Sequence, residues 1–263
     1  MTMRPILRPR TRAVLSTAGR ILAGIAILLG LWGGAVLIFS PPHFMLPGPD
    51  RVLGVLVARG GFLLTQAGIT LLEILLGLVL GVVLGMATAL LMNRMAIARR
   101  LVMPLVVATQ ALPVFAIAPL LVIWFGYGLS SKIVMATLII YFPVASAFHD
   151  GLNRTDQGLL DLARLAGASP GQTLALIRLP SALPALVSGL RLAASVAPIG
   201  AVVGEWVGAS KGLGFVMVQA NARMQTDVVF AALLLLVVMA IALRFAVEAL
   251  TRRLVPWNPE TGG

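Results

Sequence analysis

The chain has 263 residues, of which 59% are hydrophobic and only 11% are charged, and its formal net charge is +11. Soluble domains are about 45–50% apolar and about 25% charged, so this composition excludes an ordinary soluble protein and predicts an integral membrane protein with short loops. The absence of cysteine excludes disulfides, cysteine-bound metals and thiol catalysis. The alternating pattern of barrel strands is missing, so the predicted fold class is an all-α membrane protein.

The first sixty residues predict a basic segment, a membrane span and a loop. Residues 1–20 contain five arginines and no acidic residue, and an apolar run follows at 21–40. This run is too long for a signal peptide, and Pro41-Pro42 follows it in place of a clean cleavage site. We therefore expect 1–20 in the cytoplasm and a first transmembrane helix at 21–40, before a loop rich in proline and glycine.

Five further apolar runs predict five more spans, because about twenty apolar residues suffice for one spanning helix. They cover about 62–92, 101–125, 133–148, 182–207 and 228–250. Together with the first run, they predict six transmembrane helices.

The basic residues predict the orientation of these helices. Cytoplasmic loops of membrane proteins carry an excess of lysine and arginine. Six spans with both termini in the cytoplasm place fifteen of the twenty basic residues on the inside, so this is the predicted topology. Because the charge clusters beside apolar runs and forms no separate basic domain, no nucleic-acid partner is expected.

The loop at 150–180 falls on the cytoplasmic side of this layout and is predicted to be a helix–turn–helix. Helix-prone residues 159–166 end at Gly167, because glycine accepts a left-handed conformation at low cost. Ser169 is the expected N-cap of the second helix, since a proline follows it and a glutamine stands three residues later.

The second helix of the loop is expected to stop at Pro180, which cannot donate a backbone hydrogen bond. About nine residues at about 1.5 Å each are too short to cross a bilayer. The loop is therefore expected at the membrane face. Two interpretations remain open from these residues alone: an amphipathic loop resting on the bilayer, or a segment that docks into a groove on another protein.

The spacing from Asp161 to Pro180 resembles the signature loop of ABC importer permeases. That signature reads Glu-Ala-Ala, three residues, Gly, nine residues, Ile, one residue, Leu-Pro. The chain departs from it with aspartate in place of glutamate and with Leu162 in place of alanine. The resemblance implies that this loop is the coupling helix, which docks a separate ATPase subunit. The implied docking residues are Asp161, Ala163, Gly167, Ala168, Ser169, Ile177, Leu179 and Pro180.

Other segments extend the resemblance over about 60–257. The stretches ALPVFAIAP, WFGYG, LPSALPALVSGLRLA and RRLVPW resemble the nitrate/sulfonate/taurine branch of these permeases, and the first two are most similar to permeases for pyrimidine precursors of thiamine. The resemblance implies a type I importer permease core in 60–257, in the bacterial inner membrane. The implied function is the transport of a small organic solute of these classes.

The resemblance also implies the partners. They are two copies of an ATPase subunit, a second permease copy that completes a homodimer, and a solute-binding protein in the periplasm or outside the cell. The chain has no Gly-x-x-x-x-Gly-Lys-Ser/Thr phosphate loop, so we expect ATP to be used by the partner subunit and no cofactor to be bound here. We therefore expect a transporter subunit and not an enzyme.

Four residues are candidates for the translocation pathway: Gln110, Pro113, Glu73 and Glu205. A proline in a spanning helix leaves carbonyl groups that need other partners or a cavity, and an acidic residue at membrane depth is a functional candidate by default. The alternatives are a simple kink for the proline and an interfacial charge for Glu205. The two acids are also the only support for an alternative function, an ion-coupled secondary transporter.

Gly77, Gly81, Gly85 and Ala89 recur every four residues and predict close packing of the second span against another helix. Neither histidine, His43 nor His149, has ligand spacing, so no metal site is expected.

Overall fold

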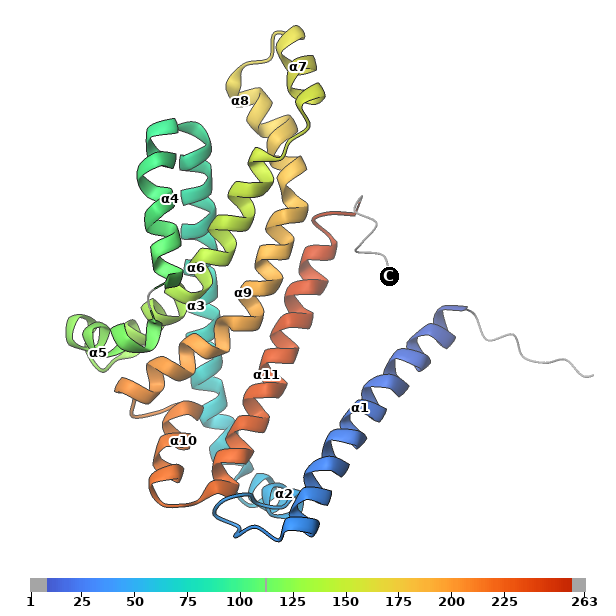
Figure 1. Ribbon diagram of the computed structural model, residues 1–263, viewed down its shortest axis with the longest axis vertical. Helices are drawn as coiled ribbons and strands as arrows, with labels where there is room; N and C mark the ends of the chain where they lie inside the picture. The colour runs from blue at the N-terminus through green and yellow to red at the C-terminus, as the bar shows by residue number, and fades with distance from the viewer. Residues whose placement is uncertain (1–8, 112, 257–263) are drawn as a thin grey trace, which may run out of the picture. The chain divides into compact units, whose positions relative to one another are not determined.

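The computed structural model describes residues 9–111 and 113–256 and shows a helical protein (Figure 1). Within those residues there is no strand. The elements are α1 (Pro9–Phe39), α2 (Pro49–Ala58), α3 (Gly60–Arg94), α4 (Ala96–Ala111), α5 (Val114–Phe125), α6 (Leu129–Asn153), α7 (Gln157–Leu165), α8 (Pro170–Thr173), the π-helical turn η1 (Leu174–Arg178), α9 (Leu179–Gly208), α10 (Leu213–Ala222) and α11 (Thr226–Arg252).

Four helical segments of the described chain are long and apolar enough to cross a membrane: α3, α6, the continuous stretch Pro170–Gly208, and α11. The helices α4 and α5 make a fifth span only if the pair, bent by 101°, is counted as one. The predicted first span lies in α1, whose described apolar part, Ala23–Phe39, is shorter than these helices. The structure thus has four or five of the six predicted spans, and the remaining one or two stay predictions.

The described residues form two compact units, which we treat separately. The first contains α1, α2 and residues 220–231. Within it, the ring of Trp32 stacks on Phe230 with centroids 5.5 Å apart, and the Trp32 indole N–H donates a 3.0 Å hydrogen bond to the Pro47 carbonyl. These contacts fix α1 against the loop that follows it and against the beginning of α11.

The second unit contains residues 61–219 and the chain from 232 onward. Its central helix is α6, which packs against glycines of both α3 and α9. A Cβ atom added to Gly77 would lie 2.4 Å from the Cβ of Ala136, and one added to Gly200 would lie 2.6 Å from the Cα of the same alanine. The prediction that the small residues of the second span serve close packing is therefore confirmed.

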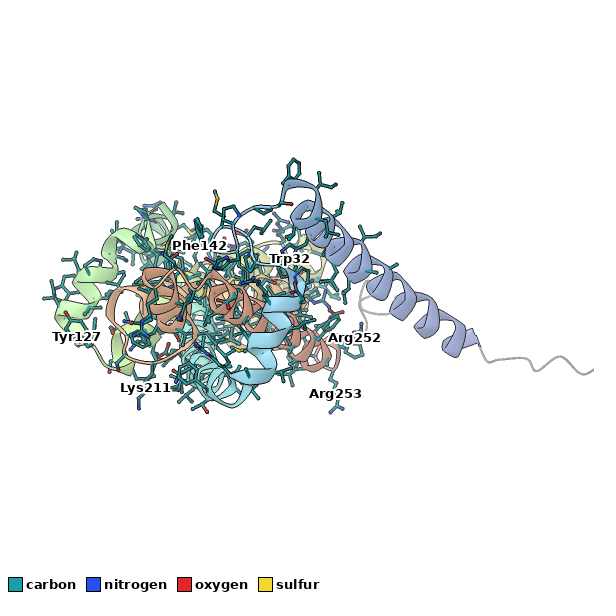
Figure 2. All side chains as sticks on the ribbon, turned by 90° about the horizontal axis from the view of Figure 1, so that it is seen from below. Trp32, Tyr127, Phe142, Lys211, Arg252 and Arg253 are labelled. Carbon is teal, nitrogen blue, oxygen red and sulfur yellow. The ribbon has the colours of Figure 1, made fainter. Side chains whose placement is uncertain are left out.

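The outer surface of the second unit is apolar, as expected for a protein surrounded by lipid. Val79 of α3 and Phe245 of α11 are 60% and 59% exposed. Near the end of α5, Trp124 and Tyr127 are also exposed, the second at the periphery of the molecule (Figure 2). Tryptophan and tyrosine are enriched where a membrane meets water.

The helical hairpin of α7 and α8 lies at one end of this unit, and α10 lies toward the other end (Figure 1). The junction of α3 and α4 shares the hairpin's end, because residues of both segments line common cavities. The fold therefore brings the 150–180 loop together with the basic residues at 94–100.

Candidate functional site

The α7–α8 hairpin, residues 157–173, is the candidate functional site, and its first helix begins with a side-chain cap. The carboxylate of Asp156 accepts a 3.1 Å hydrogen bond from the Leu159 backbone N–H. The sequence analysis placed the helix start two residues later and missed this cap. The signal was present, because aspartate is one of the preferred N-cap residues.

The turn between the two helices has the predicted glycine geometry. Gly167 has a φ of +69°, in the left-handed region. Its N–H donates to the Arg164 carbonyl at 3.0 Å, and the Ala168 N–H reaches back to the Ala163 carbonyl at 2.9 Å. This six-to-one hydrogen bond is typical of a helix that ends with a left-handed glycine, so the predicted helix stop at Gly167 is confirmed.

The start of α8 is also confirmed. The Ser169 hydroxyl accepts a hydrogen bond from the Gln172 N–H at 3.3 Å, and the Gln172 side chain accepts one from the Ser169 N–H at 2.8 Å. This is a capping box, which satisfies two backbone donors that the helix itself cannot satisfy. The hairpin therefore has a fixed turn between two capped helix ends.

The prediction that the second helix stops at Pro180 is wrong. The helix continues from Pro170 to Gly208 through the π turn η1, in which the Leu179 N–H donates to the Leu174 carbonyl five residues earlier. A proline inside an α-helix lacks one donor and its ring clashes with the carbonyl four residues before it. A wider π turn directly before Pro180 changes that register. The hairpin is thus continuous with a spanning helix.

The predicted docking residues fall into two groups. Asp161, Gly167 and Ser169 are exposed, and Asp161 forms a 2.8 Å ion pair with Arg164. Ala163 is buried inside the hairpin. Ala168, Ile177, Leu179 and Pro180 are half-buried.

Large apolar side chains of the hairpin and η1 also face outward. Leu162, which replaces the alanine of the signature, is 63% exposed, and Leu165 and Leu176 are 87% and 73% exposed. A surface with exposed leucines beside a few charges suits contact with another protein, because burial of apolar area is the main favourable term in association.

The two acidic pathway candidates lie together inside the second unit. Glu73 of α3 and Glu205 of α9 are each 1% exposed, and their carboxyl groups lie close enough to interact electrostatically. The Thr70 hydroxyl donates a 2.6 Å hydrogen bond to Glu205, and the Gly214 N–H donates to the other carboxyl oxygen. A buried carboxyl group needs such partners, since an unpaired one costs several kcal/mol.

The loop between α9 and α10 is built around this carboxyl group. Gly212 has a φ of +106°, and a Cβ atom there would lie 2.1 Å from a Glu205 oxygen. The Gly212 N–H donates to the Gln66 side chain at 2.7 Å, and the Leu213 N–H donates to the Thr70 hydroxyl at 2.9 Å. Sequence analysis did not single out Gln66 or Thr70. Their spacing before Glu73 could have indicated this cluster, because the three polar residues share one face of a largely apolar helix.

The other two pathway candidates lie on a different segment. The Gln110 side chain lies outside the described residues, and Pro113 is exposed at the start of α5. An adjacent cavity of about 270 Å³ lies between α4–α5, α6 and α9, and its lining is apolar apart from Thr109. The structure thus brings the two acids close together, whereas Pro113 lies on a different segment. The pathway role of all four residues stays a prediction.

The chain is similar in sequence to membrane components of transport systems. Residues 77–257 match the family described as "Binding-protein-dependent transport system inner membrane component". The chain is 51% identical to the "Probable ABC transporter permease protein" of Haemophilus influenzae, over 89% of this chain and 95% of that relative. It is 35% identical to the formylaminopyrimidine transport permease protein ThiX of Halalkalibacterium halodurans, over 88% of this chain and 93% of that relative.

A third relative is the taurine transport system permease protein TauC of Escherichia coli, 32% identical over 96% of this chain and 93% of the relative. Among solved structures, a chain of the MetNI methionine ABC transporter in an inward-facing conformation matches with a TM-score of 0.63 and 25% identity. That match covers 73% of this chain and 96% of the MetNI chain. The relatives give no support to an ion-coupled secondary transporter. The chain therefore belongs to the binding-protein-dependent inner membrane components of ABC importers, which are multi-pass permease subunits and not enzymes.

Proposed function

We propose that this permease imports a small organic solute and that its α7–α8 hairpin is the point at which a separate ATPase subunit drives the transport. The observation that carries the proposal is the continuity of the hairpin with a spanning helix. Pro170–Gly208 is a single helical stretch of 39 residues, or about 58 Å at about 1.5 Å per residue. A displacement at its hairpin end is therefore transmitted along α9.

The other end of the hairpin is joined to α6 almost as tightly. Only residues 154–156 separate the two helices, and Thr155 is buried, with its hydroxyl donating to the Leu152 carbonyl at 3.2 Å. The helices α6 and α9 also pack closely, because a Cβ added to Gly189 would lie 2.8 Å from the Pro143 carbonyl oxygen. Motion of the hairpin would thus move α6 and α9 as a pair.

The proposed assembly contains two permease copies, two ATPase copies and a periplasmic solute-binding protein. The family description supports a binding protein, and the missing phosphate loop supports ATP binding and hydrolysis by a partner. Both termini of the permease and the α7–α8 hairpin lie in the cytoplasm in this proposal. The distribution of lysine and arginine supports that orientation.

The substrate we propose first is a pyrimidine precursor of thiamine, with taurine, sulfonates and nitrate as the next candidates. The relatives named for formylaminopyrimidine and taurine transport support these classes. In the apolar cavity beside Pro113, Thr109 is the polar residue of the lining. Such a lining suits a path that admits a small solute without a dedicated charged binding site.

The test is uptake into proteoliposomes that contain the permease, its ATPase and its binding protein. Labelled solute should enter only when ATP and the binding protein are both present. Uptake that is driven by a proton or sodium gradient in the absence of ATP would overturn the proposal. A thermal-shift screen of the binding protein with formylaminopyrimidine, taurine and nitrate then identifies the substrate class.

A further inference from the structure

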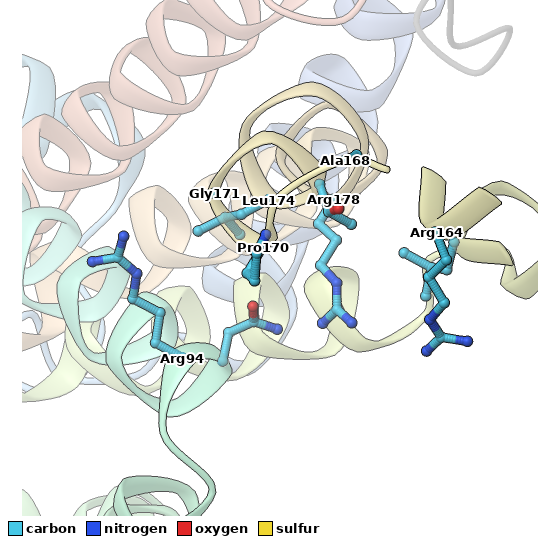
Figure 3. A pocket seen from close by; sticks show the side chains of 10 residues that line it. Arg94, Arg164, Ala168, Pro170, Gly171, Leu174 and Arg178 are labelled. Atoms are coloured by element: carbon cyan, nitrogen blue, oxygen red, sulfur yellow. The ribbon is translucent and has the colours of Figure 1, made fainter. Parts of the chain in front are cut away.

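Arginine side chains line a cavity between the α7–α8 hairpin and the end of α3 (Figure 3). It has a volume of about 360 Å³, and its lining includes Asn93 and Arg94 of α3, Arg164 of α7 and Arg178 of η1. An adjoining cavity of about 380 Å³ shares Asn93, Arg94 and Arg178 and adds Arg99 of α4. We call the two together the arginine cavity.

The positive charge of the arginine cavity is not balanced within the described chain. Arg164 pairs with Asp161 at 2.8 Å, but Arg94, Arg99 and Arg178 have no carboxylate within ion-pair distance among the described residues. Three unpaired guanidinium groups around one concave site attract an anion from outside the chain. Guanidinium groups match the oxygens of both carboxylate and phosphate by two parallel hydrogen bonds, so the lining suits an anion of either kind.

The surroundings of the cavity favour a phosphate that belongs to a lipid. Close to these arginines in the chain, on α3 and α4, large apolar side chains are exposed: Leu91, Ile97 and Leu101 are 46%, 64% and 66% exposed. The cavity therefore lies where an apolar, membrane-facing surface meets a cluster of cations. Basic pockets between helices at the cytoplasmic side of a membrane are suited to anionic lipid head groups, whose acyl chains can follow the apolar surface.

We propose that the arginine cavity binds the phosphate of an anionic phospholipid of the inner leaflet. This inference rests on one part of the proposed function, namely the orientation that places the hairpin on the cytoplasmic side. The bound phosphate bridges Arg94, at the end of α3, and Arg178, at the base of the hairpin. It thereby holds the base of the hairpin against the end of α3.

The experiment is native mass spectrometry of the purified permease in detergent, with equal amounts of phosphatidylglycerol and phosphatidylcholine added. Because it needs no ATPase, it can fail without affecting the proposed function. The unaltered chain should retain phosphatidylglycerol in preference to phosphatidylcholine. The double variant Arg94→Gln/Arg178→Gln should lose at least about fivefold of that retention. Arg154→Gln is the matched control, since Arg154 is an exposed arginine at the same end of the helices and outside the cavity lining.

Two further measurements keep the test independent of the folding of the variants. Retention of phosphatidylglycerol by the unaltered chain should fall as salt is raised, because screening weakens ionic contacts. Equal retention of the two lipids, or retention that is insensitive to salt, would overturn the proposal. Inorganic phosphate that protects the chain against heat, with no preference for phosphatidylglycerol, would also overturn it. A double variant that loses ATPase binding but keeps the lipid preference would assign the cavity to an acidic protein surface instead.

Discussion

The Thr70 hydroxyl donates a 2.6 Å hydrogen bond to the Glu205 carboxyl group and so joins two spanning helices through residues 135 positions apart. The same hydroxyl oxygen accepts a hydrogen bond from the Leu213 N–H at 2.9 Å. One small side chain thus fixes α3, α9 and the loop before α10. Such a residue should matter far more for stability than its size suggests.

Thr70→Val is expected to destabilise the permease, because valine keeps the shape of threonine but leaves the Leu213 N–H unpaired and removes a donor from buried Glu205. Each loss at a buried polar group costs about 1–3 kcal/mol. The melting temperature in detergent should fall by several degrees. The melting temperature of Thr70→Ser, which keeps the hydroxyl, should fall less. Thr65→Val, on the exposed side of α3, serves as the control. Equal melting temperatures for Thr70→Val and the control would refute this role of the hydroxyl.

Gly77→Ala is expected to destabilise the packing of α3 on α6. The added methyl group would lie 2.4 Å from the Cβ of Ala136, so one helix has to move. Overpacking of this kind costs about 1–3 kcal/mol. Gly68→Ala, on the same helix with nothing within 4 Å of its added Cβ, should leave the melting temperature unchanged or raise it. A fall of the same size for both variants would show that loss of glycine, and not the clash, is responsible.

Asp156→Ala should loosen α7 without unfolding the permease. Loss of an N-cap side chain costs about 0.5–2 kcal/mol. Amide hydrogen exchange of Leu159 and its neighbours should therefore become faster, by roughly tenfold for about 1.4 kcal/mol. Asp156→Asn, which can still accept the hydrogen bond, should exchange at nearly the original rate. Unchanged exchange in the alanine variant would show that the cap contributes nothing to α7.

Gly167→Val should weaken binding of the ATPase while the permease remains folded in the membrane. The backbone at this position has a φ of +69°, which a β-branched residue adopts only at a cost of about 1–2 kcal/mol. The turn would then change its shape and displace the exposed residues on either side. Gly167→Asn is the matched control, since asparagine tolerates the left-handed region. The measurement is the ATPase-to-permease ratio after affinity purification, and equal ratios for both variants would rule out a role for the turn geometry.

The features that the sequence predicted correctly are local. The stop at Gly167 and the capping box of Ser169 each depend on residues within one or two helical turns, and their conformational preferences are strong. The close packing around Gly77 was also predictable, because small residues repeated every four positions have few other uses in a spanning helix.

The features that could not be predicted from the sequence depend on which distant segments pack together. The proximity of Glu73 to Glu205 and the convergence of Arg94 and Arg178 on one cavity both follow from the packing of α3 against α6 and α9. In the sequence, those arginines only marked the ends of spans. The predicted stop at Pro180 failed for another reason, since the π turn before it lets the helix continue where a local rule ends it.

We propose that the α7–α8 hairpin contacts the ATPase, and the lack of cysteine allows a direct measurement of this contact. Ser169→Cys places a single thiol at the exposed start of α8, and Ser210→Cys places one at an exposed position between α9 and α10. A thiol-anchored photo-cross-linker in native membranes should join the first variant, and not the second, to a nucleotide-hydrolysing subunit. Cross-linking from Ser210→Cys alone, or from neither variant in a preparation that still imports its solute, would show that the hairpin is not the ATPase contact.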